Sequence, residues 1–181
     1  MSIVTLILPG LSNSGPEHWQ SIWERDDPTC VRVLQNEWEA PVREDWTLAL
    51  DRAVRGVNGD VVLVAHSTAC LLVAHWAAVT TAGLLARVRG ALLVAPSDPE
   101  GPQYPPGPTG FAPVPLMPLP FRSLVVASTD DVYVTLDRAQ SYATAWGSTL
   151  VNVGPLGHIN AASGHGVWPA GYALLEQLRA T

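Results

Sequence analysis

An uninterrupted apolar run, Val61–Ala65, is followed directly by a polar triplet and then by a second apolar segment. A run of this length and composition is typical of a strand that is buried on both faces of a parallel sheet. The segment from about Ala69 to Ala82 has the length and apolar character of a buried helix, with Gly83 as its expected end. The sequence therefore predicts a sharp strand-to-helix turn at His66–Thr68.

The rest of the chain alternates short apolar runs with longer amphipathic segments, which is the pattern of a parallel sheet covered by helices. Besides the first run, strands are expected at Ile3–Leu8, Cys30–Leu34, Ala91–Ala95, Ser123–Ala127 and Thr149–Val153. Helices are expected at His18–Glu24, Asp45–Val54, Thr135–Trp146 and Pro169–Leu178. We therefore expect an α/β fold with a six-stranded parallel sheet in the order 2-1-3-4-5-6 and right-handed crossovers. The 181 residues are expected to form a single domain, residues 1–181.

The segment 96–120, between the fourth and fifth predicted strands, contains ten prolines. Proline at this density excludes the interior of a regular helix or strand. The segment leaves the carboxyl end of a strand, where open parallel sheets bind their ligands. We therefore expect it to wall a ligand cleft.

Charge and cysteine content argue against several classes of function. The net charge is −6, and the ten basic residues are all Arg and are scattered along the chain, so nucleic acid is not expected as a partner. Cys30 and Cys70 fit neither a metal pair nor a disulfide framework, and we expect no metal and no cofactor. The sequence has no secretory leader pattern and no run near the ~20 apolar residues of a membrane span. We expect a cytoplasmic protein without a membrane partner, and the sequence gives no indication of its oligomeric state.

Ser67 is the candidate nucleophile because of its place on the predicted turn. A tight turn at this point exposes the Ser hydroxyl above the sheet, and the following helix N-terminus offers free backbone N–H groups. The common G-x-S-x-G pattern is present as Ala65-His66-Ser67-Thr68-Ala69, with the next smallest residue in place of both glycines. The alternative is a Ser that serves as an ordinary helix N-cap.

An acid and a base follow two later strands, in the chain order Ser, acid, His that this class of turn accompanies. The fifth predicted strand leads to Asp130 and Asp131, and the sixth leads through a Gly-Pro-Leu-Gly turn to His158. These strand ends share the sheet edge at which Ser67 lies. His158 is the candidate general base, and either Asp is a candidate for the carboxylate that orients it.

Two alternatives stay open. Asp98 follows the fourth predicted strand and is a third candidate acid, and His165 is a rival base. His18 begins a helix, where a capping role and a functional role are equally compatible with the sequence.

Backbone N–H groups that could stabilise an oxyanion are expected at two places. One is the N–H of Thr68, directly after the nucleophile, and the other is the N–H of Leu11 in the loop after the first strand. A plain Gly-rich turn is an equally compatible interpretation of that loop.

Several segments together resemble the retinoblastoma-binding protein 9 family of small serine hydrolases. They are Leu8-Pro-Gly-Leu-Ser-Asn-Ser-Gly-Pro-Glu-His-Trp-Gln20, the Ala-His-Ser turn, Ala127-Ser-Thr-Asp-Asp131, Gly157-His-Ile-Asn-Ala161 and Ser163-Gly-His-Gly166. The resemblance implies an α/β-hydrolase fold without a lid domain and a triad of Ser67, Asp131 and His158, and it favours Asp131 over Asp130. The turn departs from the family at Thr68-Ala69, where Leu-Gly is more usual.

The leading hypothesis is a hydrolase of small carboxylic esters, or of amides or thioesters, that forms an acyl-enzyme with a small-molecule acyl substrate. The alternatives are a catalytically weak protein-interaction module of the same fold, and an acyltransferase.

Overall fold

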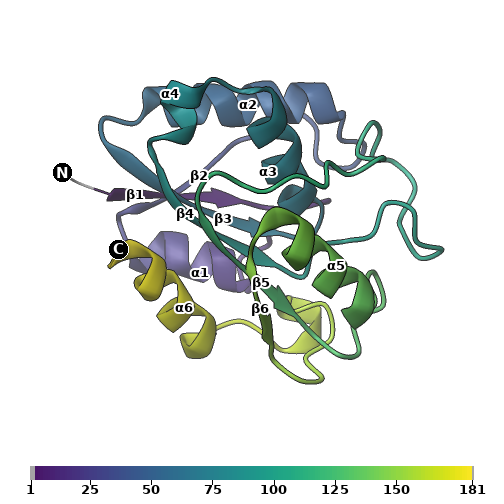
Figure 1. Cartoon of the computed structure of the whole chain (residues 1–181). Coiled ribbons are helices and arrows are strands. Elements are labelled where there is room, and N and C mark those ends of the chain that lie inside the picture. The colour runs from purple at the N-terminus through teal and green to yellow at the C-terminus, as the bar shows by residue number, and fades with distance from the viewer. Residues whose placement is uncertain (1–2, 181) are drawn as a thin grey trace.

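Six parallel strands form one sheet in the order β2-β1-β3-β4-β5-β6, as expected from the sequence (Figure 1). The computed structural model describes residues 3–180. The strands are β1 (Ile3–Leu8), β2 (Cys30–Arg32), β3 (Asp60–His66), β4 (Val88–Val94), β5 (Arg122–Ala127) and β6 (Thr149–Asn152). The helices are α1 (Trp19–Asp26), α2 (Arg43–Gly56), α3 (Thr68–Val79), α4 (Ala82–Leu85), α5 (Leu136–Trp146) and α6 (Pro169–Arg179), with a 3-10 turn η1 (Ala161–Ser163).

Helices cover both faces of the sheet and make three layers (Figure 1). On one face α2, α3 and α5 share a core with the sheet, and on the other face α1 and α6 do so. The sequence of strand β3 is continuously apolar because the strand is buried on both faces. Val61 and Leu63 pack into the first core, and Val62 and Val64 pack into the second. Each such side chain contributes roughly 1.5–3 kcal/mol on burial.

The predicted end of the long apolar helix was wrong. Helix α3 ends at Val79, and Gly83 lies inside the separate short helix α4. Thr80 takes an extended conformation at the end of α3, and its hydroxyl donates a 2.7 Å hydrogen bond to Asp51 of α2. A tertiary contact therefore ends this helix, rather than a glycine. Strand β2 is also shorter than expected, and β4 begins earlier.

The proline-rich crossover between β4 and β5 contains no regular helix or strand, as its composition predicts. It is nevertheless anchored. Phe111 and Val114 are buried in the core, and the Phe111 carbonyl oxygen accepts a 3.0 Å hydrogen bond from His75 of α3. The indole of Trp146 in α5 donates a further hydrogen bond to the Pro115 carbonyl oxygen.

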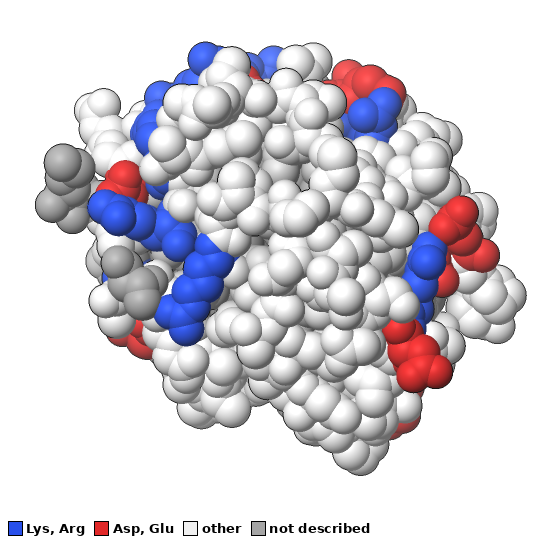
Figure 2. Space-filling model, viewed as in Figure 1, with Lys and Arg blue, Asp and Glu red and all other residues white. Residues whose placement is uncertain are grey.

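On the face shown in Figure 2, charged residues lie toward the margins and the centre is uncharged. Among residues 3–180 no helix is long and apolar enough to cross a membrane. Within the same part of the chain, no group of three or more His, Cys, Asp or Glu side chains is arranged to hold a metal ion.

Candidate active site

Ser67 lies on a strained turn between β3 and α3. Its φ of +60° and ψ of −128° lie in a region that residues other than glycine rarely adopt. The turn is held by a 3.0 Å hydrogen bond from the Ser67 N–H to the Val94 carbonyl oxygen of β4. The flanking Ala65 and Ala69 are fully buried, which accounts for the small residues at both positions. Ser67 makes no capping hydrogen bond to α3, so the helix N-cap interpretation does not describe it.

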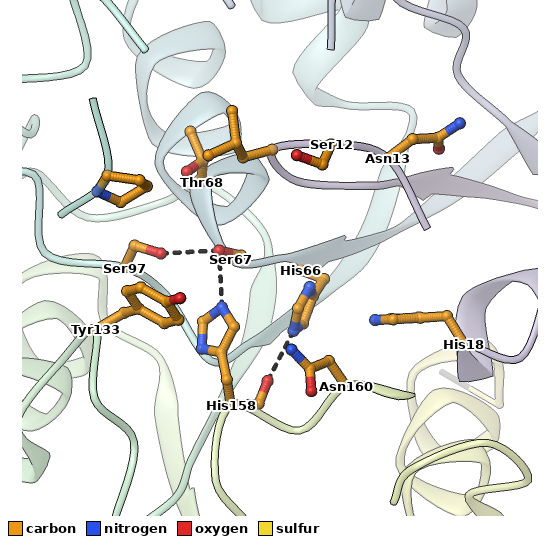
Figure 3. A pocket seen from close by; sticks show the side chains of 12 residues that line it. Ser12, Asn13, His18, His66, Ser67, Thr68, Ser97, Tyr133, His158 and Asn160 are labelled. Carbon is orange, nitrogen blue, oxygen red and sulfur yellow. Dashed lines mark hydrogen bonds between the residues drawn. The ribbon is translucent and has the colours of Figure 1, made fainter. Parts of the chain in front are cut away.

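The structure brings Ser67, His158 and Asp131 into one chain of hydrogen bonds. Nε2 of His158 lies 2.9 Å from the Ser67 Oγ (Figure 3), and Nδ1 lies 2.8 Å from Oδ2 of Asp131. The Asp131 side chain is fully buried and that of His158 is 10% exposed. Because Nδ1–H donates to the carboxylate, Nε2 accepts the hydrogen bond from the Ser67 hydroxyl.

The alternative acids and the rival base lie in other hydrogen-bond networks. Asp98 pairs with Arg138 and accepts a hydrogen bond from the Tyr142 hydroxyl. His165 contacts the Ser163 hydroxyl within its own loop. Neither residue contacts the Ser67–His158 pair.

Asp130 holds the turn that precedes His158. Its Oδ1 accepts hydrogen bonds of 2.7 Å from the Ser128 hydroxyl and from the Gly157 N–H. The Ser128 Oγ in turn accepts the Leu156 N–H at 2.8 Å. The hydrogen bonds from Ser128 and Gly157 lower the pKa of Asp130 below its ordinary value. The two adjacent Asp residues therefore make different contacts, Asp131 with the imidazole and Asp130 with the backbone that carries it.

The loop after β1 packs directly against the nucleophile turn. A Cβ added to Gly10 would lie 2.9 Å from both the Ser67 Cβ and the His66 carbonyl oxygen, and 3.4 Å from the Thr68 N. Among the described residues, the N–H groups of Leu11 and Thr68 have no hydrogen-bond partner. Glycine therefore brings two free backbone donors to the side of Ser67, at the places that the sequence indicated.

Ser97 contacts Ser67, and the sequence does not predict this contact. Its Oγ lies 2.8 Å from the Ser67 Oγ, and it donates this hydrogen bond because the Ser67 hydroxyl donates to His158. Ser97 follows β4 and the strained Ala95, whose φ is +50°. Its position at the carboxyl end of β4 is the signal that the sequence offers for Ser97.

Ser67, Ser97 and His158 line a cleft of about 220 Å³. Its wall includes Ser97 and Pro105, which confirms that the proline-rich segment borders the site. The hydroxyl of Tyr104, also in that segment, lies 3.4 Å from the Thr68 Oγ1. Figure 3 shows two sides of the cleft about the Ser67–His158 pair, with Ser97 and Tyr133 on one side and His66, His18 and Asn160 on the other.

The imidazole of His66 lies beside that of His158, and the imidazole of His18 lies beside that of His66. Burial lowers the pKa of His66 well below its ordinary value, and burial together with the Arg32 charge lowers the pKa of His18 to about 4. The His66 ring lies 4.8 Å from that of His158, and its Nε2–H donates to the His158 carbonyl oxygen at 2.9 Å. The His66 side chain therefore holds the backbone of His158 on this side of the cleft.

Comparison with known proteins gives one family. A family model described as serine hydrolase matches residues 5–177. A YdeN-like hydrolase from Pectobacterium atrosepticum is 34% identical, with a TM-score of 0.85 over 98% of this chain and 90% of that one. The ydeN gene product of Bacillus subtilis is 19% identical, with a TM-score of 0.75 over the whole of both chains. Est1E of Butyrivibrio proteoclasticus, solved with ferulic acid, is 12% identical with a TM-score of 0.69 over 99% and 90%. No curated protein matches the sequence.

Proposed function

The chain belongs to the serine hydrolase family, and we propose that it hydrolyses small carboxylic esters with Ser67, His158 and Asp131 as its catalytic triad. The observation that carries the proposal is the continuous chain of hydrogen bonds, 2.8 and 2.9 Å long, from Asp131 through His158 to the Ser67 hydroxyl. The likeness of several motifs to the retinoblastoma-binding protein 9 family supports the same assignment.

In the first half of the proposed reaction, the Ser67 Oγ attacks the ester carbonyl carbon while its proton passes to Nε2 of His158. The carbonyl oxygen becomes an oxyanion that accepts hydrogen bonds from the N–H groups of Leu11 and Thr68. Asp131 stabilises the imidazolium and keeps its tautomer. His158 then gives the proton to the departing alkoxide, which leaves as an alcohol, and the acyl group stays on Ser67.

In the second half, His158 takes a proton from water as the water oxygen attacks the acyl carbonyl. The Ser67 Oγ leaves, recovers its proton from His158, and a carboxylic acid is released. A cleft of about 220 Å³ holds a small acyl group, and we propose a small-molecule substrate for this reason.

The test is labelling with a fluorophosphonate probe, followed by peptide mass spectrometry, together with hydrolysis of p-nitrophenyl acetate and butyrate. We expect an adduct on Ser67 and ester turnover, both lost in Ser67→Ala and in His158→Ala. His165→Ala is the matched control, because His165 lies in a nearby loop and does not contact Ser67. Folded wild-type protein that is neither labelled nor active would contradict the proposal and would favour the protein-interaction module.

A further inference from the structure

The imidazole of His18 has one ring nitrogen with no partner in the described part of the chain. His18 is the N-cap of α1 and is 5% exposed. Its Nδ1 accepts a 3.1 Å hydrogen bond from the Gln20 N–H, whereas its buried Nε2 makes no hydrogen bond. An unpaired buried polar atom is uncommon because its desolvation is not compensated. His18 also lines the cleft that contains Ser67, so the unpaired atom belongs to a side chain of the cleft wall.

The hydrogen bond to Nδ1 fixes what Nε2 can do. A ring nitrogen that accepts from a backbone N–H carries no proton, so the proton of the neutral imidazole is on Nε2. The ring is neutral near pH 7, since burial and the nearby Arg32 hold its pKa near 4. The atom of His18 that is left for a ligand is therefore a hydrogen-bond donor and cannot accept.

Asn160 offers a second donor on the same side of the cleft. Its Oδ1 accepts the Ser163 N–H at 3.0 Å, which leaves its NH₂ group for other partners. Figure 3 shows this amide nitrogen turned toward His66, and the His18 ring pointing toward Asn160 and His66. The His18 and His66 rings lie 4.9 Å apart, so His18 is one ring removed from His158.

We propose that the His18 Nε2–H and the Asn160 NH₂ form a subsite for an uncharged acceptor oxygen of the substrate, next to the scissile ester. This inference rests on the proposed function and narrows its substrate to esters that carry an ether, hydroxyl or carbonyl oxygen near the reacting carbonyl. A carboxylate fits less well, because Arg32 forms a 2.8 Å ion pair with Glu24 and no Arg of residues 3–180 lines this cleft to compensate a desolvated anion.

The experiment uses esters in matched pairs in which one CH₂ group of the first ester is replaced by an oxygen atom in the second. On the acyl side, p-nitrophenyl pentanoate is compared with the p-nitrophenyl esters of acids of the same chain length. In these acids an ether oxygen replaces the third or the fourth carbon. Butyl and 2-methoxyethyl acetates form the corresponding pair on the alcohol side. The protein variant is His18→Asn. Its side-chain oxygen keeps the helix cap, and the Nε2–H donor of His18 is removed. His18→Ser provides a second variant that keeps the cap.

The measured quantity is the ratio of kcat/KM for the oxygen-containing ester to that for its hydrocarbon partner, in wild type divided by the same ratio in the variant. Differences in intrinsic ester reactivity cancel in this quotient. We expect a value of about 2–13 for at least one oxygen position, the effect of one hydrogen bond. His75→Asn is the control, because His75 is a buried histidine that bonds Phe111 away from the cleft, and its quotient should be one.

Fluorophosphonate labelling separates this inference from the proposed function. Labelled Ser67 with a quotient of one at every oxygen position, in both His18 variants, would overturn the subsite alone. Wild-type protein that is folded but unlabelled would overturn the proposed function and the subsite with it.

Discussion

The indole Nε1–H of Trp19 donates a 2.8 Å hydrogen bond to the carbonyl oxygen of Ile159, the residue that follows His158. Ile159 is fully buried, and its φ of +48° is a strained conformation for a β-branched residue. The hydrogen bond joins α1 to the loop that carries His158 across 140 positions of sequence. It therefore keeps the Ile159 peptide, and with it His158, in an orientation that the local backbone does not favour.

Replacing Trp19 by Phe should cost about 1–3 kcal/mol of unfolding free energy, because the buried Ile159 carbonyl loses this donor. We also expect a lower kcat, since the base is then held less firmly. Urea unfolding and ester hydrolysis measure the two effects. Trp38→Phe is the control, because the Trp38 indole donates no hydrogen bond among the described residues. Equal stability of the two variants would show that the Trp19 contact contributes nothing.

Gly10→Ala should reduce kcat by about 10²-fold, the effect of displacing one oxyanion donor. The added Cβ would lie 2.9 Å from the Ser67 Cβ, so the loop that carries the Leu11 N–H must move away. Gly15→Ala in the same loop has open space around the new methyl group and should leave kcat unchanged. Steady-state kinetics on one ester compare them, and equal rates would remove Leu11 from the proposed oxyanion site.

Asp131→Asn should lower kcat by roughly 10⁴-fold, because the amide no longer stabilises the imidazolium or holds the right tautomer of His158. Asp98→Asn, which disturbs the contacts with Arg138 and Tyr142, should leave most of the activity. The two variants are assayed side by side on the same ester. A larger loss in Asp98→Asn would transfer the role of the acid to Asp98.

Asp130→Ala should lower kcat by about tenfold while KM changes little. The change removes the acceptor of the Ser128 hydroxyl and the Gly157 N–H, so the turn before His158 loses its anchor. Asp137→Ala, in the first turn of α5, removes a carboxylate far from this turn and serves as the control. If both variants retain wild-type kcat, Asp130 has no positioning role.

Stability should fall as the pH decreases from 6.5 to 4. The folded-state pKa of His18 is about 4, against 6.5 for an ordinary His, so in this interval the unfolded chain binds the extra proton and the folded chain does not. The contribution of His18 to the unfolding free energy is fully present above pH 6.5, and about 3 kcal/mol of it is lost as the pH falls toward 4. The buried His66 acts in the same direction. Urea unfolding at several pH values in this range measures how the unfolding free energy changes with pH. This change should be smaller for His18→Asn than for wild type, and an equal change would contradict the lowered pKa of His18.

The sheet order could be predicted because each strand has a local signal. The Val61–Ala65 run predicts a strand that is buried on both faces of the sheet. Ser67, Asp131 and His158 each follow the end of a parallel strand, so the sequence predicts all three at one edge of the sheet. The end of α3 could not be predicted, since it depends on the Thr80–Asp51 contact between two helices.

The parts of the site that sequence reasoning missed depend on contacts between distant segments. Ser97 carries no periodic or spacing signal, and its importance follows from the 2.8 Å contact with Ser67. For His18, the sequence is equally compatible with a capping role and with a functional role. In the described part of the chain, Nδ1 of His18 accepts the capping hydrogen bond and Nε2 has no hydrogen-bond partner. This difference depends on the folded surroundings of the ring, which the sequence alone does not give.

The proline-rich crossover keeps its anchors and its ligand-facing residues apart. Phe111 and Val114 fix it in the core, while Tyr104 and Pro105 lie at the cleft. Its prolines also narrow the ensemble of the unfolded chain, so the wall is ordered at a smaller entropic cost than a flexible loop of that length. Substitutions at residues 104 and 105 should therefore change the wall of the cleft while the buried anchors Phe111 and Val114 keep the crossover in place.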